Sequence, residues 1–225
     1  MFCSVGIVQD PMGEQGVSHQ AILLGPIVME CPLYVFYEVA GESDRWAKSI
    51  VETRVKRYPL GITIRYPGRM YARLKYGIRD LAEHEFDQWQ AMPETLRPYL
   101  LKNVTLEWSQ SGKRLLCSER VRDYDGSFSK TLSQTGGISN PHFWEHVSGI
   151  CEALRSSRLY FLGVFHGGSQ ILVHKLSRDH WRPLILDVTK LGRKMYPFQL
   201  DLWRERSLER KFERQLVRFV ERFLI

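Results

Sequence analysis

The first half of the chain alternates between short apolar runs and turn-forming segments. The runs are rich in Leu, Ile, Val and Tyr and cover residues 21–28, 33–39, 45–51, 58–66, 104–108 and 114–119. Glu30-Cys31-Pro32, Gly41-Glu42-Ser43-Asp44, Pro67-Gly68 and Ser109-Gln110-Ser111-Gly112-Lys113 bound or separate these runs, as turn residues do. Short runs joined by tight turns predict a small antiparallel sheet.

One segment in this half has a helical period instead, from Met70 to Met92, where Pro93 is expected to end it. Glu85 falls in the middle of its apolar face, which is formed by Leu74, Ile78, Leu81, Trp89 and Met92. A carboxylate in such a face must be paired or protonated, because an unpaired buried charge is costly. Either Glu85 sits at the rim, in water or in a structural ion pair, or it meets a lysine on the adjacent sheet.

After about residue 121 the pattern becomes mainly helical. Asn140 and Pro141 read as an N-cap followed by proline at the first helical position, with a buried side formed by Phe143, Val147, Ile150, Cys151 and Leu154. The basic C-terminal helix places Leu208, Phe212, Leu216, Phe219 and Phe223 on one face, for packing or for a partner. The sequence therefore predicts an α+β fold with an N-terminal extension (1–20), a sheet-rich part (21–120) and a helical part (121–225).

The last third has a distinctive layout. A helix-like segment ends in a loop at residues 162–169, two apolar runs follow at 170–176 and 183–186, and the second stops on Asp187. Protein-kinase-like folds build the floor of their nucleotide site in this way, with an amide and an acid holding a metal beside phosphates. Gln170 and Asp187 occupy those two places.

Composition narrows the class of protein. The 225 residues are 44% hydrophobic and 12% aromatic, which favours a folded globule over disorder. No apolar run approaches the roughly 20 residues of a membrane span, and no signal pattern opens the chain. The cysteines form no CxxC motif, as expected for buried thiols of a reducing compartment: Cys3, Cys31, Cys117 and Cys151. We expect a cytoplasmic protein, and the sequence leaves its oligomeric state open.

Charge is unevenly distributed. The chain carries a net +7, yet residues 45–79 alone hold ten basic residues and one acid, Glu52, for a local +9. This segment is either a solvated face or a surface for an anionic partner such as nucleic acid or an acidic protein. No RNP-like, helix-turn-helix or zinc-finger signature accompanies the tyrosines that lie between its basic residues. Nucleic-acid binding is therefore kept as an alternative.

A family resemblance links these features. Residues 37–48, which end in Arg45-Trp46-Ala47-Lys48, resemble the Tyr-…-Arg-Cys-Ile-Lys element of the PhoP regulatory network protein YrbL family. The similarity continues at residues 85–89, 121–127, 169–174 and 186–187 and in the C-terminal helix. It implies a shortened, bilobal protein-kinase-like fold, with a small antiparallel-sheet N-lobe carrying one long helix and a mainly helical C-lobe. It also implies ATP and Mg²⁺ as cofactors, with Lys48 on the phosphates, Glu85 orienting Lys48, and Gln170 and Asp187 on the metal.

Departures from the kinase pattern leave the function open. Only Gly25 stands where a kinase has a glycine-rich loop over the phosphates, and Phe165 occupies the place of the catalytic aspartate. His166 is the remaining candidate base. Two functions compete: a regulatory degenerate kinase, or pseudokinase, and an active ATP-dependent phosphotransferase whose acceptor the sequence does not name. A basic module that binds nucleic acid or an acidic protein is the third alternative.

Overall fold

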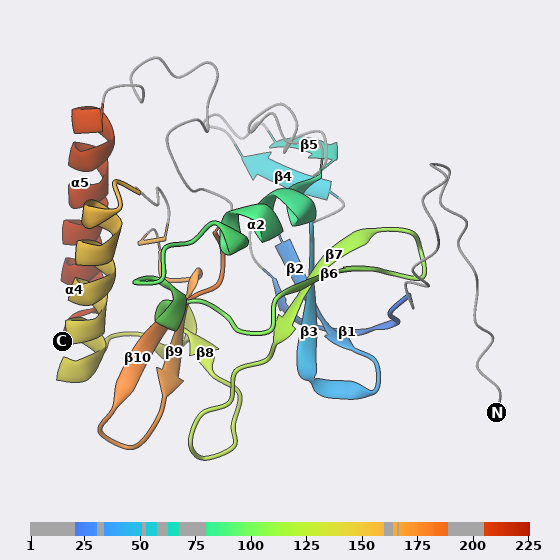
Figure 1. Ribbon diagram of the computed structural model, residues 1–225, viewed down its shortest axis with the longest axis horizontal. Helices are drawn as coiled ribbons and strands as arrows, with labels where there is room; N and C mark the ends of the chain where they lie inside the picture. The colour runs from blue at the N-terminus through green and yellow to red at the C-terminus, as the bar shows by residue number, and fades with distance from the viewer. Residues whose placement is uncertain are drawn as a thin grey trace.

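The computed structural model describes residues 21–30, 34–50, 53–57, 63–67, 80–159, 164–165, 167–188 and 205–225. It is a mixed α+β structure whose named strands pair antiparallel, as Figure 1 shows. The strands are β1 Leu24–Glu30, β2 Tyr34–Val39, β3 Glu42–Ile50, β4 Thr53–Arg57, β5 Thr63–Pro67, β6 Thr105–Trp108, β7 Arg114–Glu119, β8 Lys130–Thr131, β9 Ile171–Lys175 and β10 Trp181–Ile185. The helices are α2 Leu81–Gln90, the 3-10 helix η2 Arg97–Tyr99, α3 Leu132–Thr135, α4 Pro141–Ser156 and α5 Glu205–Phe223. The α+β class is confirmed.

The main sheet has the strand order β1-β2-β3-β7-β6 and puts Lys48 on its central strand. Its two edges meet, because the backbone N–H of Ile22 donates to the carbonyl of Trp108 at 2.8 Å and that of Gln110 donates to Ile22 at 3.2 Å. The β2–β3 connection is tighter than the predicted turn at 41–44. It takes only Ala40 and Gly41, whose φ of 85° suits glycine, and β3 already begins at Glu42.

The helix predicted from Met70 begins only at Leu81, which corrects that boundary. Asp80 is extended, with φ −121° and ψ 114°, and its carboxylate accepts hydrogen bonds from the backbone N–H groups of Ala82 at 3.0 Å and Glu83 at 3.2 Å. An aspartate in this conformation is an N-cap, so no continuous helix passes through it. Residues 70–79 themselves lie outside the described part of the chain.

The strand predicted at residues 58–66 is only partly observed. β5 covers its end and pairs with β4, whose strand was not predicted, while residues 58–62 lie outside the described residues. The segments 1–20 and 68–79 are likewise not described.

The C-terminal half combines helices with the three-stranded sheet β10-β9-β8. Asn140 caps α4 by accepting from the backbone N–H of Phe143 at 3.1 Å, and all five side chains predicted for the buried side of α4 are buried. Figure 1 shows α5 alongside α4, and Arg155 joins the two helices through Glu213 at 2.7 Å. The apolar side of α5 packs into the same buried cluster as α4 through Phe212, Phe219 and Phe223, with Leu216 partly buried. The Leu208 side chain lies outside the described part of the structure. Packing of α5 is thereby confirmed.

An apolar seam joins the main sheet to the β9–β10 hairpin. Phe36, Trp46 and Leu116 of the sheet belong to one buried cluster with Leu172, Leu184 and Leu186 of the hairpin segment. This seam fixes where the ends of the hairpin lie relative to β3. Among the described helices, none is long and apolar enough to cross a membrane.

Candidate functional site

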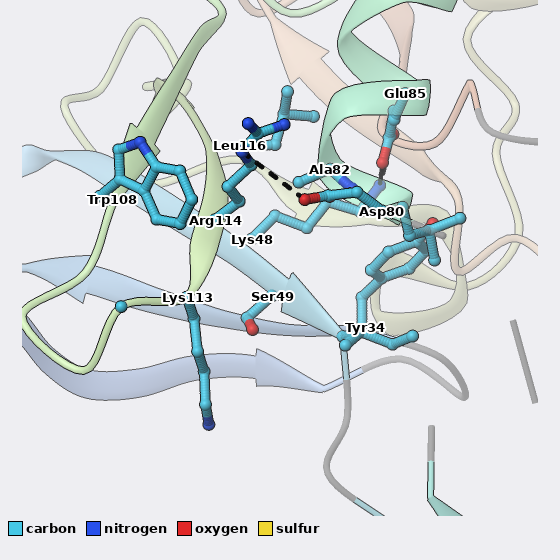
Figure 2. Close-up of a pocket in the computed structure, with 13 residues that line it drawn as sticks. Tyr34, Lys48, Ser49, Asp80, Ala82, Glu85, Trp108, Lys113, Arg114 and Leu116 are labelled. Atoms are coloured by element: carbon cyan, nitrogen blue, oxygen red, sulfur yellow. Dashed lines mark hydrogen bonds and ion pairs between the residues drawn. The ribbon is translucent and has the colours of Figure 1, made fainter. Parts of the chain in front are cut away.

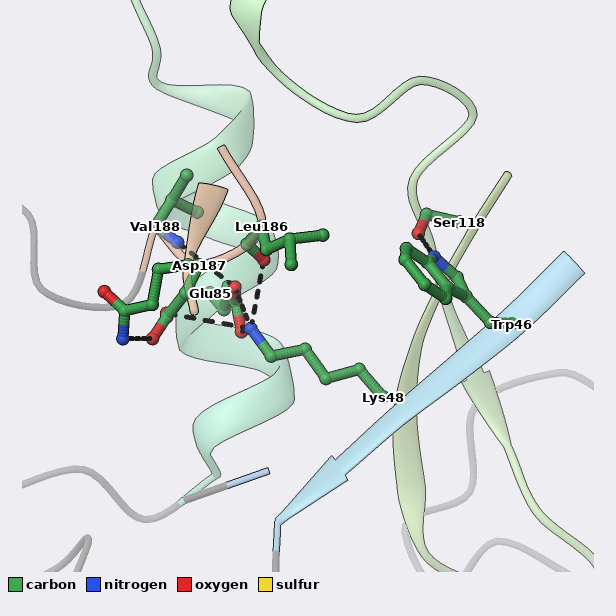
Figure 3. Close-up of polar contacts among 8 residues, drawn as sticks. Trp46, Lys48, Glu85, Ser118, Leu186, Asp187 and Val188 are labelled. Carbon is green, nitrogen blue, oxygen red and sulfur yellow. Dashed lines mark hydrogen bonds and ion pairs between the residues drawn. The ribbon is translucent and has the colours of Figure 1, made fainter. Parts of the chain in front are cut away.

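Lys48 and Glu85 form a buried ion pair between the main sheet and α2. Lys48 Nζ lies 2.5 Å from Glu85 Oε1 and 2.7 Å from Oε2, and Figure 3 shows the lysine reaching from β3 to the helix. Lys48 is 4% exposed and Glu85 only 1%. The predicted meeting of Glu85 with a lysine on the sheet is therefore confirmed, and a rim position in contact with water is excluded.

Local structure explains the pairing. Side chains alternate along β3, so Ala47 faces the cluster with Leu115 and Cys117 while Lys48 faces α2. Glu85 lies one turn after Leu81, whose side chain packs in the seam cluster, and so points the same way. The Lys48 ammonium also sits 3.8 Å from the ring centroid of Tyr34, a cation–π contact in a desolvated place.

The base of the β9–β10 hairpin completes the cluster. Asp187 Oδ1 lies 3.6 Å from Lys48 Nζ, and Gln170 Nε2 donates to Asp187 Oδ2 at 3.1 Å. Lys48 Nζ also donates to the carbonyl of Leu186 at 3.4 Å. Antiparallel pairing puts the residue before β9 beside the residues after β10, as the backbone bond from Leu186 N to Gln170 O shows. Four of the predicted site residues thus share one place.

Burial changes the acidity of the Glu85 carboxyl in this cluster. Burial raises the pKa of the Glu85 carboxyl to about 7; Lys48 opposes this shift, and the nearby Asp187 adds to it. The backbone N–H of Val188 also donates to Glu85 Oε1, at 3.2 Å. One ammonium therefore faces two buried carboxyl groups. An added cation beside Asp187 would favour the ionised form of both carboxyl groups.

A magnesium ion fits the donor types at the hairpin base. Asp187 offers a carboxylate and Gln170 an amide oxygen, and Mg²⁺ commonly uses one or two protein oxygens together with phosphates and water. Gln170 presents its NH₂ group to Asp187 here, and rotating the amide by half a turn would present the oxygen instead. Within the described residues, no group of three His, Cys, Asp or Glu side chains is arranged to hold a metal ion.

The other predicted site residues lie apart from the cluster or outside the description. Gly25 is in β1, where a Cβ atom would come within 3.1 Å of the carbonyl oxygen of Glu38, so its smallness serves the close approach of β1 and β2. Its role towards phosphate stays a prediction. Phe165 is 2% exposed and packs against the rings of Phe212 and Phe219, with centroids 5.7 and 5.0 Å apart. His166 lies outside the described residues.

Aromatic side chains fill the space next to Lys48 on the same face of β3. The Trp46 indole donates to Ser118 Oγ at 2.6 Å, as Figure 3 shows. The Trp46 ring also lies 5.0 Å from that of Phe36, measured between centroids. The cavity left beside the ion pair measures about 20 Å³, room for about one water molecule. The place of Trp46 was predictable from the sequence, because it precedes Lys48 by two residues and residues two apart in a strand share a face.

A larger cavity of about 240 Å³ lies on the other side of Lys48, between the start of α2 and the β6–β7 turn. Figure 2 shows Arg114 reaching across it from β7 towards Asp80, at 3.7 Å, and Arg114 also pairs with Glu83 at 2.6 Å. Ligand pockets usually measure some 300–1,000 Å³. Both cavities are therefore smaller than a nucleotide needs.

Comparison with known proteins adds no family assignment: no protein-family model matches the chain, and no curated protein matches it significantly.

Proposed function

We propose that this chain is a kinase-like regulatory protein of the YrbL type, a degenerate kinase whose site takes a nucleotide phosphate with Mg²⁺ and does not transfer it. The observation that carries the proposal is the buried cluster in which Lys48 meets Glu85 at 2.5 Å and Asp187 at 3.6 Å. A lysine on a central strand, a glutamate on the packed helix and an acid after a hairpin are the parts that kinases bring together at the phosphates.

Retention of these parts supports binding. A buried ion pair adds little to stability, because apolar residues of similar volume often stabilise a fold equally well. Its presence at Lys48 and Glu85 therefore favours a role beyond packing. The lysine would contact phosphate, and Gln170 and Asp187 would hold the metal ion, which supplies charge neutralisation beside the phosphates. The Asp187 carboxyl and the adjacent Gln170 amide suit that cation as oxygen donors.

Loss of other parts argues against turnover. Phe165, at the place of the catalytic aspartate, is part of the aromatic core with α5 and cannot accept a proton. Trp46 and Phe36 occupy the face of the sheet that continues from Lys48. A ligand larger than a phosphate group must displace these rings or enter from another side.

The second candidate is an active ATP-dependent phosphotransferase. The fully formed Lys48–Glu85 pair and the contact between Gln170 and Asp187 favour it, because active kinases need the same arrangement. The third candidate is a basic module that binds nucleic acid or an acidic protein, and the described side chains of residues 45–79 give it no support. Lys48 is paired with Glu85, and Arg45 is paired with Glu42 and Glu107.

The test is thermal unfolding with and without ATP and Mg²⁺. A ligand at 100-fold its Kd stabilises the protein by about 2.7 kcal/mol. We expect stabilisation of the wild type, its loss in Asp187→Asn, and its retention in Arg155→Ala, a matched surface change on α4. If ATP and Mg²⁺ leave the unfolding temperature of the wild type unchanged, the protein does not bind nucleotide and the proposal is wrong.

A second variant asks whether the aromatic rings limit access. Trp46→Leu keeps an apolar side chain in the seam and frees space next to Lys48. We expect the nucleotide to bind more tightly to this variant than to the wild type, measured as a larger thermal shift at equal ligand concentration. Unchanged binding would show that the ligand enters elsewhere.

A further inference from the structure

Three histidines meet where the tip of the β9–β10 hairpin touches the start of α4. The ring of His180, at the hairpin tip, lies 4.9 Å from that of His142 and 5.5 Å from that of His146, measured between centroids. One turn of α4 separates His142 from His146, so both face the hairpin. The side chain of Asn140 also donates from Nδ2 to the carbonyl of Asp179 at 2.9 Å. These contacts add to the apolar cluster in which Val173 and Ile185 of the hairpin pack with residues of α4.

Other ionisable groups face these imidazoles from every neighbouring element. On α4, Glu145 Oε2 lies 2.9 Å from His142 Nδ1. On η2, the Tyr99 hydroxyl lies 3.4 Å from His146 Nδ1. On the hairpin, Arg182 Nε donates to His174 Nδ1 at 3.1 Å. The facing groups are His142, Glu145 and His146 of α4, Tyr99 of η2, Lys102 and Asp123 of the connecting segments, His174 of β9, His180 of the tip and Arg182 of β10.

Protonation conflicts with this arrangement. Burial lowers the pKa of His146, and the neighbouring His180 and Arg182 lower it further. Burial and Arg182 also lower the pKa of His174, and Asp123 opposes that shift. His174 and Arg182 are paired residues of the hairpin itself, so their contact does not depend on docking to α4. When the hairpin tip leaves α4, His146 becomes exposed and loses His180 and Arg182 as neighbours, so the open form binds more protons than the docked one.

We propose that this histidine cluster is an acid-sensitive latch that holds the β9–β10 hairpin against α4. Docking is fully favoured above the ordinary histidine pKa and weakens as the pH falls below it, because the open form then takes up more protons. Gln170 and Asp187 stand at the base of the same hairpin, at the end opposite the tip. The latch itself does not depend on nucleotide binding.

Amide hydrogen exchange tests the latch. Protection factors, which are corrected for the intrinsic effect of pH, are measured for β9 and β10 at about pH 7.5 and about pH 5.5, on either side of the ordinary histidine pKa. The amides of β3 and β7 in the main sheet are the internal reference. The opening constant of the hairpin should rise by up to tenfold per pH unit for each proton taken up on opening, and that of the reference strands should not follow.

Variants identify the groups responsible. His180→Gln removes the ring that both α4 histidines share and should reduce the pH dependence of hairpin protection; His142→Gln serves if that chain does not fold. His84→Gln, on α2, is the matched control and should behave as the wild type. An NMR titration should find His146 below its ordinary pKa in the wild type and nearer to it in His180→Gln. Equal pH dependence in wild type and both cluster variants would overturn the proposal.

Discussion

The two halves of the molecule are organised around centres of opposite chemistry. The sheet-rich half buries an ion pair, Lys48 with Glu85, at 4% and 1% exposure. The helical half buries aromatic rings, with Phe143 at 0%, Phe212 at 0% and Phe219 at 1%. Apolar packing stabilises a fold directly, whereas a buried ion pair roughly offsets its own desolvation. The ionic centre is therefore the half in which function should be sought.

The largest effect is expected from breaking the ion pair. Lys48→Met leaves the Glu85 carboxyl buried without its partner, which should lower the free energy of unfolding by about 3–5 kcal/mol. The double variant Lys48→Met with Glu85→Leu should recover most of that loss, because neither charge remains. Urea unfolding of both single variants and the double variant measures the coupling. Simple addition of the two single losses would show that the residues do not act as a pair.

In the helical half the loss should follow cavity formation instead. Leu154→Ala, at a fully buried position of α4, should cost about 2–5 kcal/mol through lost transfer energy and the space left behind. Combined with Lys48→Met, it should add within about 0.5 kcal/mol, as independent sites do. A much larger coupling would mean that the two centres form one cooperative core.

The pH dependence of the ion pair has a definite sign. Burial raises the pKa of Glu85 to about 7 in the folded protein, above its unfolded value. The folded chain then holds a proton that the unfolded chain lacks. The stabilisation that comes from this bound proton is therefore fully present below about pH 4.3, the ordinary pKa of a glutamate, and is lost as the pH rises through about 7.

Glu85→Gln isolates this contribution. Because the histidine latch acts in the opposite direction, the useful quantity is the difference in unfolding free energy between wild type and variant. That difference should change by up to about 1.4 kcal/mol per pH unit between about pH 4.3 and about pH 7. A difference independent of pH would show that Glu85 stays ionised throughout.

A smaller effect is expected at the start of α4. Asn140→Ala removes the cap on Phe143 and the bond to Asp179, and should cost about 1 kcal/mol. Asn140→Asp keeps a capping oxygen and loses only the donor to Asp179, so it should cost less in global unfolding while still weakening protection at the hairpin tip. Equal losses in both measurements would show that the cap and the hairpin contact are inseparable.

Local patterns in the sequence predicted much of this arrangement. Glu85 lies four residues after Leu81 and four before Trp89 in an apolar stripe, so the sequence indicated that it is buried and needs a partner. The Asn140-Pro141 start of α4 and the aromatic side of α5 were equally local signals. The layout of Gln170, two strands and Asp187 predicted their meeting, because a hairpin returns its ends to one place.

What could not be predicted depends on contacts between distant residues or on competing local signals. The closure of the sheet through Ile22 and Trp108 joins residues far apart in sequence. The start of α2 was placed too early because the apolar period runs on before Asp80, whose capping geometry ends it. The two-residue spacing of Trp46 and Lys48 puts both on one face of β3, but that Phe36 fills the same place depends on how β2 pairs with β3, which no local pattern states.

The central claim, a nucleotide site without transfer, is tested most directly by phosphate release. Wild type, Asp187→Asn and Arg155→Ala would be mixed with Mg²⁺ and a small excess of ATP, and free phosphate followed over many hours. The account predicts ATP-dependent stabilisation of the wild type with phosphate release no faster than in Asp187→Asn. Release that is faster in wild type and in Arg155→Ala, and lost in Asp187→Asn, would contradict it and establish an active enzyme.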